Sequence, residues 1–327
     1  MIDLVKELVE PSRRALVEHL VSGQKTVNEL VHATGLKQPN VSNHLSRLKS
    51  KGIVRSVKVG REVFYSFNGV EMAKIASEMV GKRDAIAPIE LNISTVKTFA
   101  NFAAVGDEAF CSEVVDSCLL NGFSLTDIYS DLFGEALEMI GGWWHSGAID
   151  EAQEHLATAI IERLMARVLH FSNLPSRAGV TAVLGCSPGN YHSIGLRMIS
   201  DLLKLNGVRV FFLGANVPMP AFMSSVRKVK PDIVLMSCAL EFNYPDFLTL
   251  VRSMQNLREA GQNFSIGIGG WAAMNHAPEL VKNGVDFISP NLKEFEKTVI
   301  PMILKKDWSG IHEATLMKIH GSDPLPS

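Results

Sequence analysis

Residues 181–195 read TAVLGCSPGNYHSIG, a short apolar run that ends in small and turn-forming residues. Four more runs of this texture follow, separated by segments with helical apolar spacing: RVFFLGA (209–215), IVLMSCA (233–239), FSIGIGG (264–270) and VDFIS (285–289). Buried strands that alternate with helices are typical of a doubly wound α/β fold with a parallel sheet. We therefore predict a Rossmann-like domain over residues 178–305, with its ligand site beyond the carboxyl ends of the strands.

Three sequence features fall on these predicted strand ends. His192 lies in the loop after the first strand, Ser237 ends the third, and Gly269-Gly270 ends the fourth. An exposed or helix-capping histidine would explain His192 taken alone. Glycines at a strand end let a bulky ligand lie against the main chain. The three features together favour a cleft in which His192 reaches a bound metal.

The order Asn190-x-His192-x-x-Gly195, then Ser237 and Gly269-Gly270, resembles the cobalamin-binding domain of methionine synthase and related corrinoid proteins over about residues 178–303. The resemblance implies that His192 replaces the nucleotide base as the lower cobalt ligand. Position 190 is commonly Asp in that family. An Asn can still orient the imidazole by accepting a hydrogen bond, but it lends less negative charge. The cofactor-binding residues implied here are His192, Gly195, Ser237, Gly269 and Gly270.

Residues 94–175 have helical apolar spacing almost throughout and predict a four-helix bundle. Three glycines interrupt the spacing, namely Gly106, Gly122 and Gly147. Asp150 and Gln153 have the spacing of a capping box at the start of the last helix. The predicted bundle core contains Phe102, Phe110, Phe133, Leu137 and Ile140.

Two pairs of residues stand at the ends of the last two predicted helices. Trp144-His145 closes one helix and Glu154-His155 opens the next. Core aromatic residues and a surface histidine at a helix C-terminus would give the same pattern. The block resembles the four-helix cap of CarH-type cobalamin photoreceptors. This resemblance implies that Trp144 and Glu154 contact an adenosyl group, that His155 lines the pocket, and that His145 is a candidate upper cobalt ligand after photolysis.

The N-terminal region predicts a helix-turn-helix followed by a two-stranded wing. Val27–Thr34 and Gln38–Lys51 are amphipathic segments separated by Gly35, and residues 53–59 and 62–67 alternate apolar and polar side chains around a tight turn. Residues 37–61 contain seven basic side chains and no acidic one, which suits contact with phosphates. The predicted DNA-contacting residues are Gln38, Asn40, Ser42, Asn43, His44, Arg47, Lys58 and Arg61.

The stretch LKQPNVSNHLSRLKSKGIVRSVKVGREVFYSF (36–67) resembles the ArsR-type winged helix. The resemblance implies a dimer, or a larger homo-oligomer, on a near-palindromic operator of double-stranded DNA. One departure is that VNELVHAT, the stretch that matches the metal-sensing helix of many ArsR proteins, has no cysteine. We therefore expect another part of the chain to sense the signal.

The bulk composition sets the remaining expectations. The chain has 327 residues, four scattered cysteines without a C-x-x-C motif, and no apolar run near the roughly 18 residues of a membrane span. We expect a cytoplasmic protein without membrane contact. The predicted division is a winged helix (1–80), a linker (81–93), a helical cap (94–175), the sheet domain (178–305) and a tail (306–327).

CarH-type proteins usually carry a MerR-type DNA-binding domain, so the sequence predicts the same sensory arrangement behind an ArsR-type domain. We expect a non-enzymatic, light-responsive repressor in which photolysis of adenosylcobalamin changes assembly and operator binding. Three alternatives stay open. They are a regulator that senses cobalamin without light, a corrinoid carrier for methyl transfer, and an ArsR regulator with an unrelated sensor.

Overall fold

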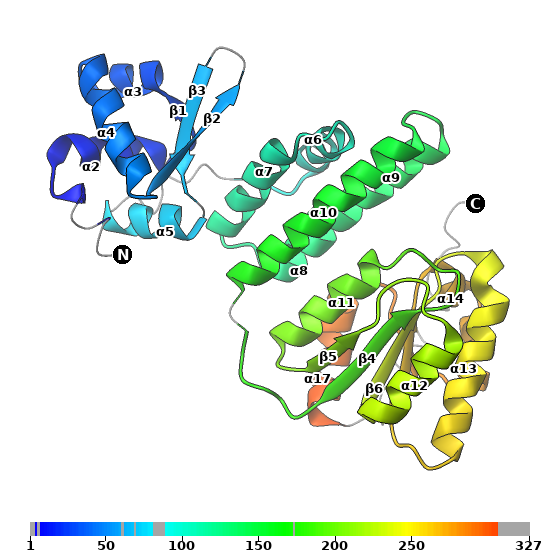
Figure 1. Ribbon diagram of the computed structural model, residues 1–327. Coiled ribbons are helices and arrows are strands. Elements are labelled where there is room, and N and C mark those ends of the chain that lie inside the picture. Colours follow the sequence, from blue (N-terminus) through cyan, green and yellow to red (C-terminus); the bar gives the residue numbers. More distant parts are fainter. Residues whose placement is uncertain are drawn as a thin grey trace. The chain divides into compact units, whose positions relative to one another are not determined.

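The computed structural model describes residues 4, 7–59, 62–68, 70–80, 89–172 and 174–306 (Figure 1). The chain divides into two compact units. We call residues 1–124 and 131–164 the N-terminal unit, and residues 125–130 and 165–327 the sheet unit. Within the described ranges, no helix combines the length and the apolar character that crossing a membrane requires.

The winged helix contains helices α2 (Pro11–Leu20), α3 (Val27–Thr34), α4 (Gln38–Ser50) and α5 (Val70–Met79), with strands β1 (Lys25–Thr26), β2 (Val54–Val59) and β3 (Glu62–Phe67). A capping box of Thr26 and Glu29 starts α3, and Gly35 ends it with a left-handed φ of 70°. The predicted helix-turn-helix and wing are thus confirmed. Strand β1, which pairs with β3, was not predicted. Residues 60, 61 and 81–88, including the predicted turn and much of the linker, lie outside the described residues.

The helical block contains α6 (Ile93–Ala104), α7 (Glu108–Leu120), α8 (Leu125–Asp127), the π-helix η2 (Ile128–Gly134), α9 (Glu135–His145) and α10 (Glu151–Phe171). Because α8, η2 and α9 are consecutive, the block has the predicted four helical segments. The breaks fall at the three predicted glycines, which all have positive φ. Asp150 and Gln153 exchange both hydrogen bonds of the predicted capping box.

Burial in this block follows the predicted core in part. Phe133 and Ile140 are fully buried, as expected. Phe102, Phe110 and Leu137 are only half-buried, which corrects their assignment to the core. The rings of Phe102 and Phe110 instead stack on each other with centroids 4.0 Å apart.

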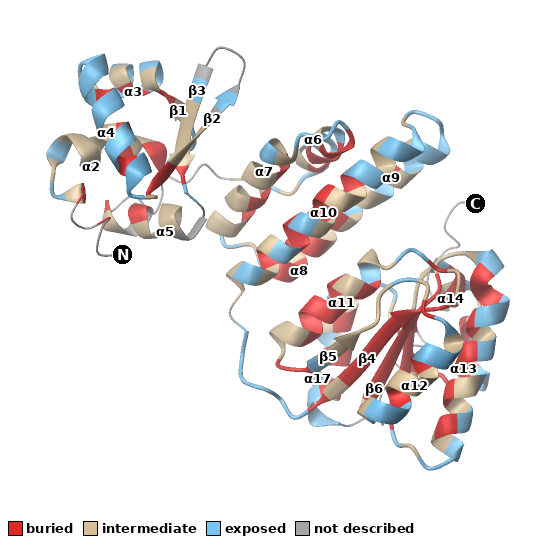
Figure 2. Cartoon of the chain, in the orientation of Figure 1, coloured by how far each residue is buried: buried red, intermediate tan, exposed pale blue. Residues whose placement is uncertain are grey.

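The sheet unit contains five parallel strands in the order β5-β4-β6-β7-β8, which are β5 (Arg209–Phe212), β4 (Thr181–Cys186), β6 (Ile233–Ser237), β7 (Ser265–Gly269) and β8 (Phe287–Ile288). The predicted doubly wound fold is confirmed. Almost every residue of β4 and β6 is buried (Figure 2), as in β7 and β8, whereas the edge strand β5 is partly exposed. Val183 and Val234 pack with α12 (Met219–Val229) and α13 (Tyr244–Glu259).

The order of the strands reverses at β4. From β4 the chain passes through α11 (Ile194–Leu205) to β5 at one edge and then returns to β6 on the other side of β4. The remaining α-helices are α14 (Trp271–Asn275), α15 (Ala277–Lys282), α16 (Leu292–Glu294) and α17 (Ile300–Lys305), with the 3-10 helix η3 (Glu241–Asn243) and the π-helix η4 (Phe295–Val299). A crevice for ligands is expected where the order reverses, outside the carboxyl ends of β4 and β6.

Candidate functional site

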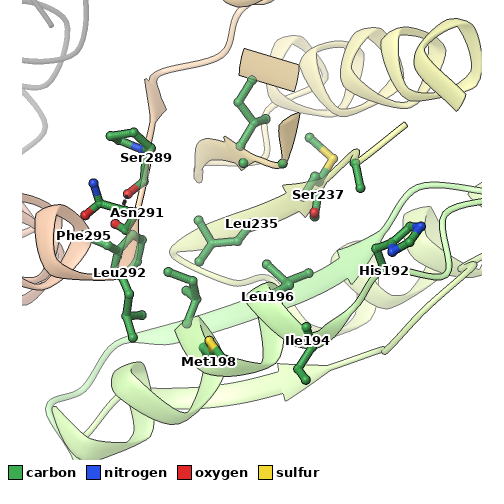
Figure 3. A pocket seen from close by; sticks show the side chains of 18 of the residues that line it. His192, Ile194, Leu196, Met198, Leu235, Ser237, Ser289, Asn291, Leu292 and Phe295 are labelled. Carbon is green, nitrogen blue, oxygen red and sulfur yellow. Dashed lines mark hydrogen bonds between the residues drawn. The ribbon is translucent and has the colours of Figure 1, made fainter. Parts of the chain in front are cut away.

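A cavity of about 320 Å³ opens at this reversal point within the sheet unit (Figure 3). Its walls come from the loop after β4, from α11, from the ends of β6, β7 and β8, and from α16. All five residues that the sequence assigned to the ligand site of this domain line the cavity, namely His192, Gly195, Ser237, Gly269 and Gly270. The fold therefore brings together residues that are up to 78 positions apart in the chain.

The loop that carries His192 is held in place by the side chain of Asn190, which is completely buried. The Oδ1 atom of Asn190 accepts a hydrogen bond of 3.1 Å from the main-chain N–H of His192, and its Nδ2 atom donates one of 2.9 Å to the main-chain oxygen of Ser237. This differs from our expectation that Asn190 orients the imidazole. The two-residue spacing favours a local turn in which the amide oxygen bonds to main chain.

Asn216, which follows β5, adds further bonds to this loop. Its Oδ1 atom accepts from the Gly189 N–H at 2.8 Å, its Nδ2 atom donates to the Tyr191 hydroxyl at 2.9 Å, and its main-chain N–H donates to the Asn190 carbonyl at 2.8 Å. Sequence reasoning missed Asn216. Its position directly after a predicted strand was the only available signal. The bonds fix the main chain of the loop and leave the His192 residue exposed at one end of the cavity (Figure 3).

The glycines of the cavity wall have different roles. Gly270 has a φ of 95°, and a Cβ atom there would lie 2.3 Å from the Cys238 oxygen, so the fold itself requires this glycine. At Gly269 the nearest atom to such a Cβ would be the Ser289 oxygen at 3.7 Å, and at Gly195 nothing lies within 4 Å. Gly195 and Gly269 therefore leave open space in the cavity that a side chain would fill, which fits a ligand packed against the main chain.

The predicted cap residues lie in the N-terminal unit. Trp144 and His145 end α9, and Glu154 and His155 lie in the first two turns of α10, across a short turn at Gly147. The side chain of Trp144 is 49% exposed, so the alternative of a plain core aromatic is wrong for this residue. That these residues and the sheet cavity form one site stays a prediction.

Glu154 has both carboxylate oxygens engaged. Its Oε2 atom lies 2.5 Å from Nδ1 of His155, and its Oε1 atom accepts a hydrogen bond of 2.9 Å from the Thr158 hydroxyl. Nε2 of His155 lies 3.5 Å from Oε1 of Glu151. The His155 ring is therefore held on the surface of α10 between two carboxylates.

The second candidate site is the surface of α4 in the winged helix. Val41, Leu45 and Leu48 face the core. The predicted DNA-contacting residues that are exposed are Gln38, Asn40, Ser42, Asn43 and Arg47 on α4 and Lys58 on β2. Arg61 lies outside the described residues. The side chain of His44 is half-buried and turned toward Glu10, with Nδ1 3.8 Å from Oε2, and its contact with DNA stays a prediction.

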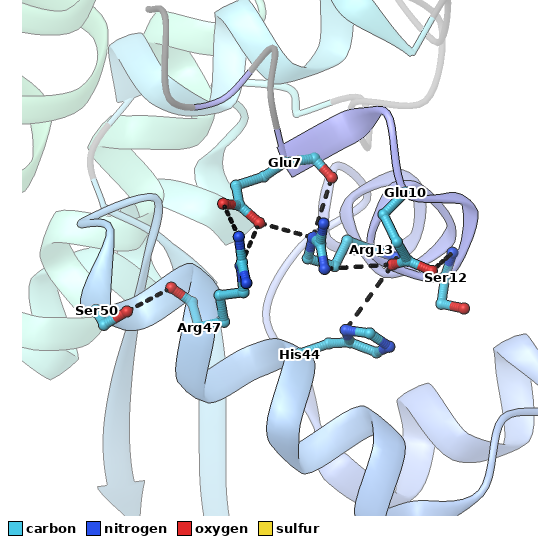
Figure 4. A network of polar contacts seen from close by, with 7 residues as sticks. All are labelled: Glu7, Glu10, Ser12, Arg13, His44, Arg47 and Ser50. Carbon is cyan, nitrogen blue, oxygen red and sulfur yellow. Dashed lines mark hydrogen bonds and ion pairs between the residues drawn. The ribbon is translucent and has the colours of Figure 1, made fainter.

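Arg47 belongs to an ion-pair network that sequence reasoning did not find (Figure 4). Its Nε and Nη2 atoms donate to both carboxylate oxygens of Glu7, at 2.8 and 3.1 Å, and the Arg13 Nε atom lies 2.7 Å from Oε2 of the same carboxylate. Glu7 is only 3% exposed. The hydrogen bonds from Arg47 hold the pKa of Glu7 below its ordinary value, with a smaller effect from the charge of Arg13 and against the opposing effect of burial.

Family models match the parts of the chain that carry the two candidate sites. Residues 180–291 and 96–169 match two models described as B12 binding domain, and residues 10–56 match the model described as bacterial regulatory protein, arsR family. The chain thus combines an ArsR-type winged helix with B12-binding domains.

Among curated proteins, the chain is similar to the HTH-type transcriptional repressors CarA and CarH of Myxococcus xanthus. It is 30% identical to CarA over 139 residues, which cover 42% of this chain and 47% of CarA. It is 30% identical to CarH over 171 residues, which cover 52% of this chain and 55% of CarH. The chain spans about half the length of these curated relatives. The resemblance to CarH-type regulators with an ArsR-type domain is confirmed.

Among solved structures, the fold is similar to that of the monomethylamine corrinoid protein of Methanosarcina barkeri, with a TM-score of 0.54 and 18% sequence identity. The similarity covers 63% of this chain and 96% of that protein. At this identity the likeness concerns the fold alone.

Proposed function

We propose that this protein is a cobalamin-binding transcription regulator. The observation that carries the proposal is the cavity at the reversal of strand order, because a loop held by side-chain hydrogen bonds presents the exposed His192 beside walls left open by Gly195 and Gly269. His192 would hold cobalt as its lower ligand. Ser237, Gly269 and Gly270 would line the space for the nucleotide tail.

In this proposal, the winged helix binds the DNA operator. The exposed polar side chains of α4 would contact base edges of a near-palindromic operator, and Lys58 would contact phosphate. A homodimer would place two copies of α4 on the two half-sites. Repression is the mode of action that the similarity to CarA, CarH and ArsR-type proteins favours.

We further propose that light is the signal. When the bound form is adenosylcobalamin, light breaks its cobalt–carbon bond and frees the adenosyl group. In the dark, Trp144 and Glu154 would contact that group and His155 would line its pocket. His145, exposed at the end of α9, would be the candidate upper ligand for cobalt afterwards. The resulting change in assembly would alter operator binding, which requires unequal ligand affinity for the two states.

The experiment that tests this function is absorption spectroscopy of the full chain loaded with adenosylcobalamin, before and after green light. The dark spectrum should show imidazole ligation that is lost in His192→Ala, and the illuminated spectrum should show a stable species that is lost in His145→Ala. His170→Ala, which removes an exposed histidine from the C-terminal end of α10, is the matched control and should change neither spectrum.

Two other functions make different predictions. A light-independent cobalamin sensor would bind its operator equally well in the dark and after illumination. A corrinoid carrier would accept and return a methyl group and show no sequence-specific DNA binding. Operator binding measured with and without cobalamin, in the dark and in light, separates the three.

A further inference from the structure

The cavity in the sheet unit has chemically uniform walls. The side chains around its interior are mainly aliphatic, aromatic and thioether groups, such as Leu196, Met198, Leu235, Leu292, Phe287 and Phe295. Among the described residues that line it, none is Asp, Glu, Lys or Arg. A ligand group that enters this space exchanges water for apolar surface on most sides.

Most of the few polar side chains in the cavity wall already make hydrogen bonds within the chain or face water. The Ser289 hydroxyl donates to the Asn291 carbonyl at 3.1 Å, and Asn291 Oδ1 accepts from the Glu294 N–H at 2.9 Å while the residue remains exposed. The Ser237 side chain differs, because its hydroxyl has no hydrogen-bond partner within the described part of the chain. The wall therefore offers one uncommitted and nearly buried hydroxyl, on a residue that is 8% exposed.

We infer that this cavity selects corrinoids by the chemistry of their lower base, accepting an apolar benzimidazole and discriminating against a purine. The inference rests on the proposed function, since it requires that His192 displaces the base from cobalt and leaves the nucleotide tail free to occupy the cavity. A displaced dimethylbenzimidazole has one ring nitrogen that needs a hydrogen bond, and Ser237 can donate it. Its methyl groups and fused ring suit the aliphatic and aromatic walls.

An adenine base would meet the same walls with more polar atoms. Its exocyclic amine and additional ring nitrogens would lose their hydrogen bonds to water, and the cavity has one uncommitted hydroxyl to replace them. Buried polar groups without partners are costly, whereas buried apolar surface is favourable. The difference should appear in binding affinity, without any contribution from the upper ligand.

The test is a titration of the full chain in the dark with three corrinoids that carry the same methyl upper ligand. They are methylcobalamin, its counterpart with adenine as the lower base, and methylcobinamide, which lacks the base. We expect methylcobalamin to bind at least about ten-fold more tightly than the adenine form, and cobinamide to bind more weakly than methylcobalamin.

A pair of variants assigns the discrimination to the cavity. Met198→Gln changes a cavity-lining side chain to one of nearly the same size that can hydrogen-bond to a purine, and should reduce the affinity ratio at least about three-fold. Met223→Gln on α12 makes the same change outside the cavity and should leave the ratio unchanged. The melting temperatures of both variants without corrinoid control for damage to the fold.

The outcomes separate this inference from the function on which it rests. Equal affinities for the benzimidazole and adenine forms would overturn the selectivity and leave cobalamin binding intact. Equal affinities for all three corrinoids would show that the base does not enter the cavity, and would also overturn it. Failure to bind any of the three corrinoids would contradict the proposed function itself.

Discussion

The side-chain amide of Asn190 donates a hydrogen bond to the main-chain carbonyl of Ser237, joining the loop after β4 to the end of β6. The amide is completely buried and uses its oxygen for the His192 N–H. An ionised carboxylate at position 190 could accept the second bond but could not donate the first. The aspartate that is common in corrinoid proteins is therefore not interchangeable with this asparagine.

We expect Asn190→Asp to lower the free energy of unfolding by about 1–3 kcal/mol, because it sets two acceptors against each other in a buried position. Chemical denaturation without corrinoid measures the change. Asn121→Asp is the control, since Asn121 donates to the main-chain oxygen of Ser117 at 2.8 Å but is exposed. An equal loss in both variants would contradict a special role for the buried bond.

Glu7 should make the stability of the winged helix depend on pH. The pKa of this carboxyl is held below its ordinary value of 4.5 in the folded state, so the unfolded state binds more protons as the pH falls. The stabilisation is complete above the ordinary value and is lost as the pH falls through the lowered one. Unfolding of the wild type and of Glu7→Gln, compared between about pH 6 and pH 3, should show a stability difference that shrinks with acidity. A constant difference would contradict this assignment.

Substitutions in the winged helix should distinguish residues that contact bases from residues that contact phosphates. Asn43→Ala on α4 should weaken binding to the specific operator by about 1–3 kcal/mol and leave non-specific binding nearly unchanged. Lys58→Ala on β2 should weaken both and reduce the slope of log K against log salt by about one. Fluorescence anisotropy at several salt concentrations measures both effects. Lys97→Ala, which changes an exposed lysine on α6, should alter neither.

The adjacent glycines of the cavity wall should respond oppositely to the same substitution. Gly270→Ala puts a Cβ atom 2.3 Å from the Cys238 oxygen at a positive φ, and should cost about 1–3 kcal/mol of stability. Gly269→Ala meets no atom closer than 3.7 Å and should leave the free energy of unfolding nearly unchanged while weakening cobalamin binding. Thermal unfolding and a cobalamin titration measure the two effects. If Gly269→Ala bound cobalamin normally, the open wall would have no role in binding.

The sheet and the helix-turn-helix could be predicted from the sequence because each depends on a repeated local pattern. Apolar strands with small residues at their ends revealed five strands, and Gly35 and Gly147 marked helix ends. Strand β1 has only two residues, too few for an alternating pattern. The π-helical turn of η2 has the same apolar spacing as the α-helices beside it, so nothing in the sequence distinguished it.

The candidate sites could be predicted only as far as topology determines them. The positions of His192, Ser237 and Gly269 follow from strand ends that meet at one edge of a parallel sheet. The partner of Arg47 does not, because Glu7 lies 40 residues away and no periodic pattern connects them. The bonding of Asn190 depends on the conformation of a single loop, and sequence indicated the residue but not its partners.

The bonds that Asn190 and Asn216 make around the His192 loop have a thermodynamic consequence for ligand capture. Ordering a free loop costs about 1–2 kcal/mol per residue in backbone entropy. These bonds are made within the chain and do not involve the ligand, so they offset part of that cost and leave more of the contact energy for affinity. Weakening these bonds should therefore reduce affinity even where no contact with the ligand is lost.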